Sequence, residues 1–174
     1  MSERLCHKYG PGRLPYASRR DLGAGIAMAA TGALSLIIWF GGVGLLFALG
    51  IGDQNLGFVF GLSLLAAPIA IPAAFLVGTL LWRQCPPERN HRRYGALFGA
   101  ITALCSLIIG ALGPASFFAL ASVVGGEMVV TEGMMFFLVM IVFGIPVALV
   151  AVGWLVVPLG AFGGWYHERA KLTS

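Results

Sequence analysis

Four long apolar stretches constrain this chain more than any other feature of its sequence. They cover residues 22–49, 56–82, 94–124 and 133–165. Each is long enough to cross about 30 Å of hydrocarbon as an α-helix, which takes roughly 20 residues. Runs such as residues 34–40 are apolar on every face, whereas the strands of a membrane barrel alternate apolar and polar residues. The sequence therefore predicts an all-α integral membrane fold, a bundle of four transmembrane helices arranged as two hairpins.

The composition agrees with this fold class. Hydrophobic residues make up 59% of the 174 residues and charged residues only 10%, whereas a soluble domain carries about 25% charged residues. So few charges cannot cover a water-facing surface, which excludes soluble nucleases, kinases and dehydrogenases. We expect a basic N-terminal segment at residues 1–21, a membrane domain at residues 22–166 and a tail at residues 167–174.

The distribution of charge predicts the orientation of the spans. All eleven Lys and Arg residues lie before the first span, between the second and third, or after the fourth, while the other two connections hold Asp53, Glu127 and Glu132. Basic residues near span ends remain on the cytoplasmic side. Both termini are therefore predicted to be cytoplasmic, most simply at the plasma membrane. The net charge of +4 then favours contact with anionic lipid headgroups over binding of nucleic acid.

The first span has an alternative interpretation. Residues 18–22, Ser-Arg-Arg-Asp-Leu, resemble a twin-arginine export signal, which would make the first apolar stretch a removable leader. Such leaders have a hydrophobic core of about 7 to 15 residues, and the stretch at residues 22–49 is longer. We expect a retained helix.

A short internal repeat links the first and third spans. Residues 31–38 read Thr-Gly-Ala-Leu-Ser-Leu-Ile-Ile, and residues 102–109 read Thr-Ala-Leu-Cys-Ser-Leu-Ile-Ile, each after an Arg-Arg pair. Duplication of a helical hairpin and chance matching in Leu-rich and Ile-rich sequence both explain the similarity. Duplication would imply parallel repeats related by a pseudo-two-fold axis along the membrane normal.

The repeat places two hydroxyl pairs in the membrane. Thr31 and Ser35 are four residues apart, as are Thr102 and Ser106, so each pair shares one helix face. In the first interpretation these hydroxyls bond to their own helix or across a helix contact, where such bonds average about 0.6 kcal/mol. In the second, the four hydroxyls face one another and line a polar site or path.

Prolines interrupt three of the spans. Pro68 and Pro72 lie in the second, Pro114 in the third, and Pro146 and Pro158 in the fourth. Each removes a backbone donor and frees the carbonyl four residues earlier, so we expect a kink at each. The carbonyls freed by Pro68 and Pro72 are candidates for contact with a solute, as in the broken helices of transporters, although neighbouring helices often satisfy such carbonyls.

Glycine pairs at a spacing of four residues predict close helix packing, because they let backbones approach in lipid. The pairs are Gly57 with Gly61, Gly95 with Gly99, and Gly160 with Gly164. The spacing leaves open whether these faces join helices of one chain, copies of the chain or a partner protein.

The spans lack the residues that membrane chemistry uses. Ionisable side chains occur only at their margins, which excludes a proton-coupled pump and catalysis by an intramembrane carboxylate pair. Cys6, His7, Cys85, His91 and His167 are expected at the cytoplasmic face and are suitable for zinc or redox chemistry, but their spacing matches no regular ligand motif. We expect no metal and no cofactor, and an enzyme at this face is the third alternative.

These features predict a non-enzymatic multi-pass membrane protein. The first interpretation is an interaction or accessory subunit that packs through glycine-rich faces, as a homo-oligomer or within a larger membrane complex, among membrane lipids. The alternative is a small permease or channel-like carrier for a neutral or lipid-like solute. In that alternative, the solute contacts the four hydroxyls and the carbonyls freed by Pro68 and Pro72.

Overall fold

The computed structural model describes residues 20–85 and 92–170, and the predicted N-terminal segment and tail lie largely outside these ranges. The described residues form α2 (Arg20–Ala48), α3 (Gln54–Gln84), α4 (Arg92–Gly110), α5 (Leu112–Val124), α6 (Val130–Ala148), the π-helix η2 (Leu149–Gly153) and α7 (Trp154–Ala170). Four stretches are long and apolar enough to cross a membrane: Asp21–Ala48, Gln54–Gln84, Arg93–Val124 and Val130–Arg169. The predicted all-α bundle of four candidate spans is confirmed.

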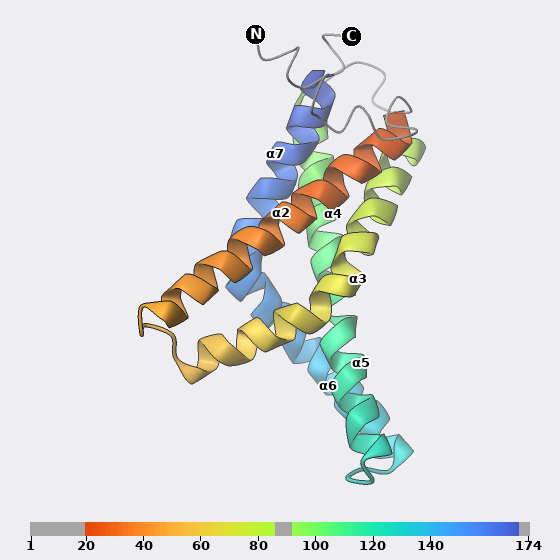
Figure 1. Ribbon diagram of the computed structural model, residues 1–174. Coiled ribbons are helices and arrows are strands. Elements are labelled where there is room, and N and C mark those ends of the chain that lie inside the picture. The colour runs from red at the N-terminus through yellow and green to blue at the C-terminus, as the bar shows by residue number, and fades with distance from the viewer. Residues whose placement is uncertain (1–19, 86–91, 171–174) are drawn as a thin grey trace.

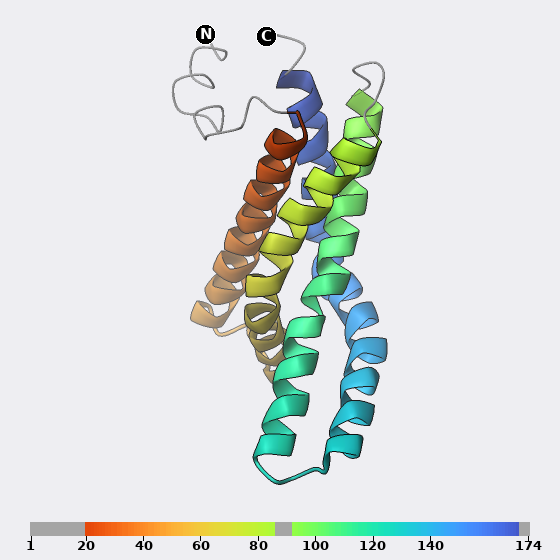
Figure 2. The same ribbon diagram turned by 90° about the vertical axis from the view of Figure 1, so that its right-hand side faces the viewer.

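Two helical hairpins make up the bundle. Helices α2 and α3 form the first, and α4 with α5 and α6 with α7 form the two arms of the second (Figures 1 and 2). Helix α4 packs against α7 and α3, and α2 packs against α3 and α7. The start of α2, the end of α3, the start of α4 and the end of α7 share one end of the molecule, which we call the basic end.

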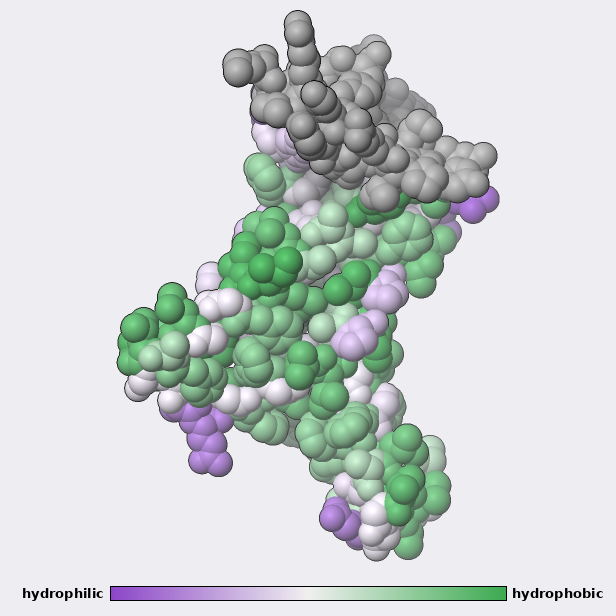
Figure 3. All heavy atoms as spheres, viewed as in Figure 1, coloured by the Kyte–Doolittle hydropathy of each residue, from purple (hydrophilic) through white to green (hydrophobic). Residues whose placement is uncertain are grey.

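At the other end, which we call the acidic end, Asp53 and Glu127 lie in the connections between helices and Glu132 lies in the first turn of α6. Figure 3 shows hydrophilic patches there beneath a broad apolar surface. The described Arg residues therefore lie at the basic end and these three carboxylates lie at the acidic end, as expected for a protein that spans a membrane, while Asp21 and Glu168 also lie at the basic end. The assignment of the basic end to the cytoplasm remains a prediction.

The hairpins pack together at the basic end and diverge toward the acidic end (Figure 1). There, α5 and α6 pack on each other and the start of α5 also packs on α3, while the rest of the first hairpin leans away. The buried apolar side chains accordingly form separate clusters. One surrounds Trp82 and Met28 near the basic end, and another surrounds Trp39 and Val152 where the hairpins begin to separate.

Two acidic side chains cap the starts of helices at the acidic end. The carboxylate of Asp53 accepts a hydrogen bond from the backbone N–H of Leu56 at 2.8 Å, at the start of α3. The carboxylate of Glu132 accepts one from the N–H of Val129 at 3.1 Å, at the start of α6. Both satisfy a donor that the helix cannot satisfy internally.

The third and fourth spans are interrupted near prolines. The third divides at Ala111 into α4 and α5, three residues before Pro114, which has no N–H to donate to the carbonyl of Gly110. In the fourth, η2 begins three residues after Pro146. Helix α3 continues through Pro68 and Pro72 as one helix, and it bends along its length (Figure 1).

Candidate functional site

Two of the three glycine pairs join α4 to α7 inside the chain. A Cβ added at Gly95 would lie 2.6 Å from the carbonyl oxygen of Gly164, and one added at Gly160 would lie 2.8 Å from the carbonyl oxygen of Gly99. Distances this short mean that the two backbones are in direct contact, which only glycine permits. These four glycines close the basic half of the second hairpin.

The third glycine pair is placed differently. A Cβ at Gly61 would have no neighbouring atom within 4 Å, and one at Gly57 would meet only the ring of Phe47 at 3.5 Å. Within the described part of the chain, therefore, no other helix backbone packs closely on this pair.

A small cavity lies between the two hairpins, on the side of the basic end. Its volume is about 20 Å³, and its walls include all four hydroxyl residues of the repeat, Thr31, Ser35, Thr102 and Ser106. Ser35 and Thr102 are each only 1% exposed. The structure thus brings both halves of the sequence repeat to one place, while duplication itself remains a hypothesis.

The four hydroxyls also bond to their own helices. Thr31 donates to the carbonyl of Ala27 at 2.6 Å, Ser35 to Thr31 at 2.8 Å, Thr102 to Phe98 at 2.8 Å and Ser106 to Ala103 at 2.9 Å. The bonds to their own helices that the first interpretation predicts are therefore present. All four residues also line one cavity, whose volume holds about one water molecule, and the binding of a solute by these hydroxyls stays a prediction.

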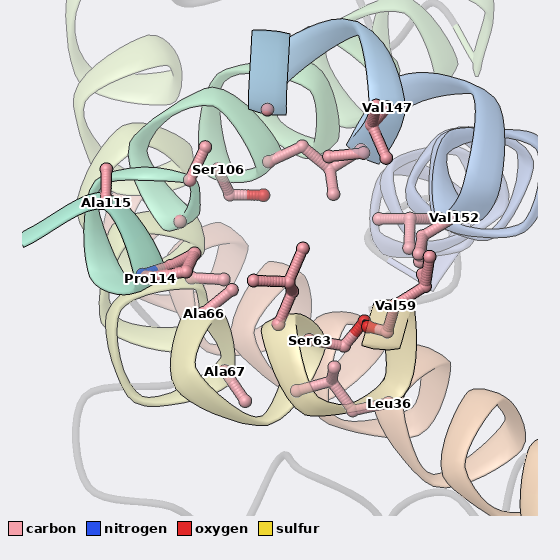
Figure 4. A pocket seen from close by; sticks show the side chains of 18 of the residues that line it. Leu36, Val59, Ser63, Ala66, Ala67, Ser106, Pro114, Ala115, Val147 and Val152 are labelled. Atoms are coloured by element: carbon pink, nitrogen blue, oxygen red, sulfur yellow. The ribbon is translucent and has the colours of Figure 1, made fainter. Parts of the chain in front are cut away.

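A larger cavity of about 110 Å³ begins where the hairpins diverge. Side chains from both hairpins surround it, and Figure 4 shows them pointing toward a common open space. Small and aliphatic residues form most of its wall, including Leu36, Ala66, Pro114 and Val147. Of the described residues that line it, only Ser63 and Ser106 carry hydroxyls, and none is charged.

The two cavities are neighbours. Gly32, Ser106 and Val156 line both of them, and the hydroxyl of Ser106 projects into the open space in Figure 4. Together they form an apolar chamber with a small hydroxyl-lined extension toward the basic end.

Pro68 and Pro72 do not belong to this site. Both are exposed on α3, and neither lines either cavity. The region around Pro146 in the fourth span does contribute to the site. Val147 and Ala148, next to this proline, and Val152 of η2 line the large cavity. Short π-helical segments occur frequently at functional sites.

A buried polar pair that was not predicted from the sequence lies at the basic end. Glu168 on α7 is fully buried and accepts a 2.8 Å hydrogen bond from the indole Nε1 of Trp82 on α3. Trp82 lies at the end of the second apolar stretch, a position typical of an interfacial anchor, but its side chain is only 2% exposed and packs inside the bundle. The spacing of residues in α7 could have indicated this burial. Glu168 follows Gly160 and Gly164 at intervals of four residues, so it lies on the same helix face, which packs against Gly95 of α4.

The predicted set of cysteines and histidines is only partly placed. Cys6, His7 and His91 lie outside the described residues, Cys85 is exposed after α3, and His167 lies near Trp82 with ring centroids 5.9 Å apart. Among the described residues, no group of three or more His, Cys, Asp or Glu side chains is arranged to hold a metal ion.

The four candidate spans make this chain a multi-pass membrane protein. No known protein family, curated protein or solved structure matches it. Its function is therefore inferred from the geometry of its own residues.

Proposed function

We propose that this protein is a small, non-enzymatic carrier that binds an uncharged, lipid-like molecule within the bilayer. The observation that supports this proposal is the apolar cavity of about 110 Å³, whose walls come from both hairpins. A dry cavity of about 150 Å³ admits a benzene-sized molecule. The cavity here therefore accommodates a short length of hydrocarbon chain, with the remainder of the molecule extending between the diverging hairpins.

The chemistry of the wall selects against charged ligands. A charged group placed among residues such as Leu36, Ala66 and Val147 would lose its hydration without gaining a partner, which is strongly unfavourable. A hydrocarbon chain has no hydration to lose on entering from the lipid, and it exchanges dispersion contacts with lipid tails for dispersion contacts with the wall. Neutral, chain-like molecules are thus the class that this cavity fits.

A photoreactive hydrocarbon tests the proposal. A diazirine-bearing dodecane is incorporated into nanodiscs that hold the protein, and the labelled residues are mapped by mass spectrometry. We expect saturable labelling of cavity residues such as Ala66 and Val147, with competition by unlabelled dodecane. The variant Ala66→Phe fills the cavity and should lose most of this labelling, whereas Ala121→Phe, at an exposed position of α5, should retain it. Non-saturable labelling spread over the lipid-facing surface would overturn the proposal.

A second candidate function is supported by the position of Gly57 and Gly61. This pair has the spacing of a close helix contact, but no helix of the chain packs closely on it. It would fit an accessory or self-assembling subunit, with a second copy of the chain as the simplest partner. The variant Gly61→Leu should then lower the oligomeric mass in nanodiscs, and Gly44→Leu, at a second uncovered glycine, should not. A mass that is unchanged by Gly61→Leu would remove this pair from any interface.

A further inference from the structure

We infer that the ligand of the large cavity is an alcohol, bound with its hydroxyl group in the small cavity and its hydrocarbon chain in the large one. This inference rests on the proposed function, because it assigns the chemical class and the direction of the molecule bound there. It follows from three observations: the adjacency of the two cavities, the hydrogen bonding of their hydroxyls, and the lack of charge in their walls.

The adjacency of the cavities sets the direction. Gly32, Ser106 and Val156 are shared by both walls, so a chain in the large cavity ends beside the small one. The small cavity is lined by Met28 and Gly99, which lie nearer the basic end than residues of the large cavity such as Leu36 and Pro114. The polar end of the ligand therefore points toward the basic end, and its chain points toward the diverging halves of the hairpins.

The hydrogen bonds determine which polar group fits. Each of the four hydroxyls already donates its proton to a carbonyl of its own helix. A serine or threonine hydroxyl has one proton to donate but two lone pairs with which to accept. The small cavity thus presents acceptors only, and the matching group must be a donor.

Size and charge narrow the donor to one group. A volume of about 20 Å³ admits a group the size of a water molecule, which fits a hydroxyl and excludes a bulky headgroup. Among the described residues, no charged side chain lines the small cavity, so an ammonium group would enter without a counter-ion from them. A ketone, ester or ether oxygen can only accept, and it would meet hydroxyls that must first give up their backbone bonds.

Competition between three probes tests the assignment. Dodecan-1-ol, 1-methoxydodecane and dodecane compete with the diazirine-bearing dodecane for wild-type protein in nanodiscs, at equal mole fractions in the lipid. The alcohol should compete about fivefold better than the ether, which corresponds to about 1 kcal/mol for one hydrogen bond. The alcohol and the ether partition differently between water and lipid, and this difference is the same for every variant. The decisive quantity is therefore the ratio of the potency of the alcohol to that of the ether, compared between the wild-type protein and each variant.

A matched pair of threonine variants identifies the acceptors. Thr102→Val keeps the shape of the side chain and removes an acceptor from the small cavity. Thr79→Val makes the same change in α3, where Thr79 donates to the carbonyl of Phe75 at 2.8 Å and lines neither cavity. The preference for the alcohol should fall in Thr102→Val and remain in Thr79→Val. Ser106→Ala removes another acceptor and should also lower the preference, which provides a second variant if Thr102→Val fails to fold. Combining Thr102→Val with Ser106→Ala should bring the preference closer to onefold than either change alone.

The outcomes separate the two proposals. If all three probes compete equally well in wild-type protein, the cavity binds hydrocarbon chains with no preference for a hydroxyl group. The inference is then overturned, while the proposed function stands. Equal loss of preference in Thr102→Val and Thr79→Val would also overturn it. If no probe competes and labelling is non-saturable, the proposed function itself fails.

Discussion

Glu168 shows, at the scale of single residues, that the burial of a side chain near the end of a span does not follow from its position in the sequence. Its position beyond the fourth apolar stretch is typical of a charge in the headgroup region, and so is that of Trp82 at the end of the second. Both side chains are instead buried and joined to each other. Their positions along the chain give only their depth, whereas their burial depends on how α3, α4 and α7 approach one another. The hydroxyls of the repeat were easier to place, since their spacing in the helix fixes a common face.

The indole of Trp82 contributes to stability through its bond to Glu168. Removing one partner from a buried acceptor costs about 1–3 kcal/mol, so Trp82→Phe should lower the thermal unfolding midpoint by several degrees in nanodiscs. The control is Trp154→Phe, because Trp154 also donates through Nε1, to the carbonyl of Ala151 at 2.8 Å, but on an exposed side chain. A shift of similar size in both variants would show that loss of an indole, rather than of the buried bond, is responsible.

At the scale of helices, the pattern of apolar residues predicts where the spans lie, whereas the pattern of glycines predicts close packing without identifying the helices that pack together. The spans follow directly from hydropathy, because lipid requires every backbone group in a span to be bonded within it. The spacing of Gly95, Gly99, Gly160 and Gly164 indicates that each helix makes a close contact. It does not identify the partner helix, because spacing along one helix carries no information about which other helix packs against it. The break at Ala111 and the segment η2 follow the positions of Pro114 and Pro146 only approximately.

The contact between α4 and α7 should be sensitive to a single methyl group. In Gly164→Ala the new Cβ would overlap the carbonyl of Gly95, and because backbone cannot move aside cheaply, the helices must separate at a cost of about 1–3 kcal/mol. We expect a lower thermal unfolding midpoint in nanodiscs. Gly44→Ala adds the same methyl group where no atom lies within 4 Å, and it should leave the midpoint unchanged or raise it. Equal stability of the two variants would contradict the close backbone contact.

The start of α3 should depend on its capping carboxylate. Asp53→Ala removes the acceptor of the Leu56 N–H, and loss of such a cap costs about 0.5–2 kcal/mol. Faster amide hydrogen exchange is therefore expected in the first turn of α3. Glu127→Ala removes an exposed carboxylate at the same end of the molecule, for which the structure shows no capping bond, and exchange in α3 should not change. Unaltered exchange in Asp53→Ala would mean that solvent replaces the cap at no cost.

At the scale of the whole molecule, two properties have different origins. The gathering of basic residues at one end follows from the sequence alone, because every Lys and Arg lies before the first span, between the second and third, or after the fourth. The divergence of the hairpins, and with it the apolar chamber, does not. It depends on which helices approach closely: the glycine pairs of α4 and α7 contact each other, Gly57 and Gly61 contact no other helix backbone, and Gly113 of α5 contacts the backbone of Leu65 on α3 beside the chamber. The three glycine pairs of the sequence therefore do not mark the position of the chamber.

The direction of insertion is the remaining prediction for the whole molecule, and labelling of single cysteines tests it. Basic residues near span ends hold to the cytoplasmic side, so Cys85, exposed after α3 at the basic end, should react with a membrane-impermeant maleimide only after the cells are opened. The chain for this test carries Cys6→Ser and Cys105→Ala, which leaves Cys85 as the single cysteine. Replacing Cys85 with serine and adding Asp53→Cys or Glu127→Cys moves the single cysteine to the acidic end, and labelling should then occur in intact cells. Reaction of Cys85 in intact cells, with protection of both acidic-end cysteines, would reverse the orientation and place the hydroxyl-lined cavity nearer the outer leaflet.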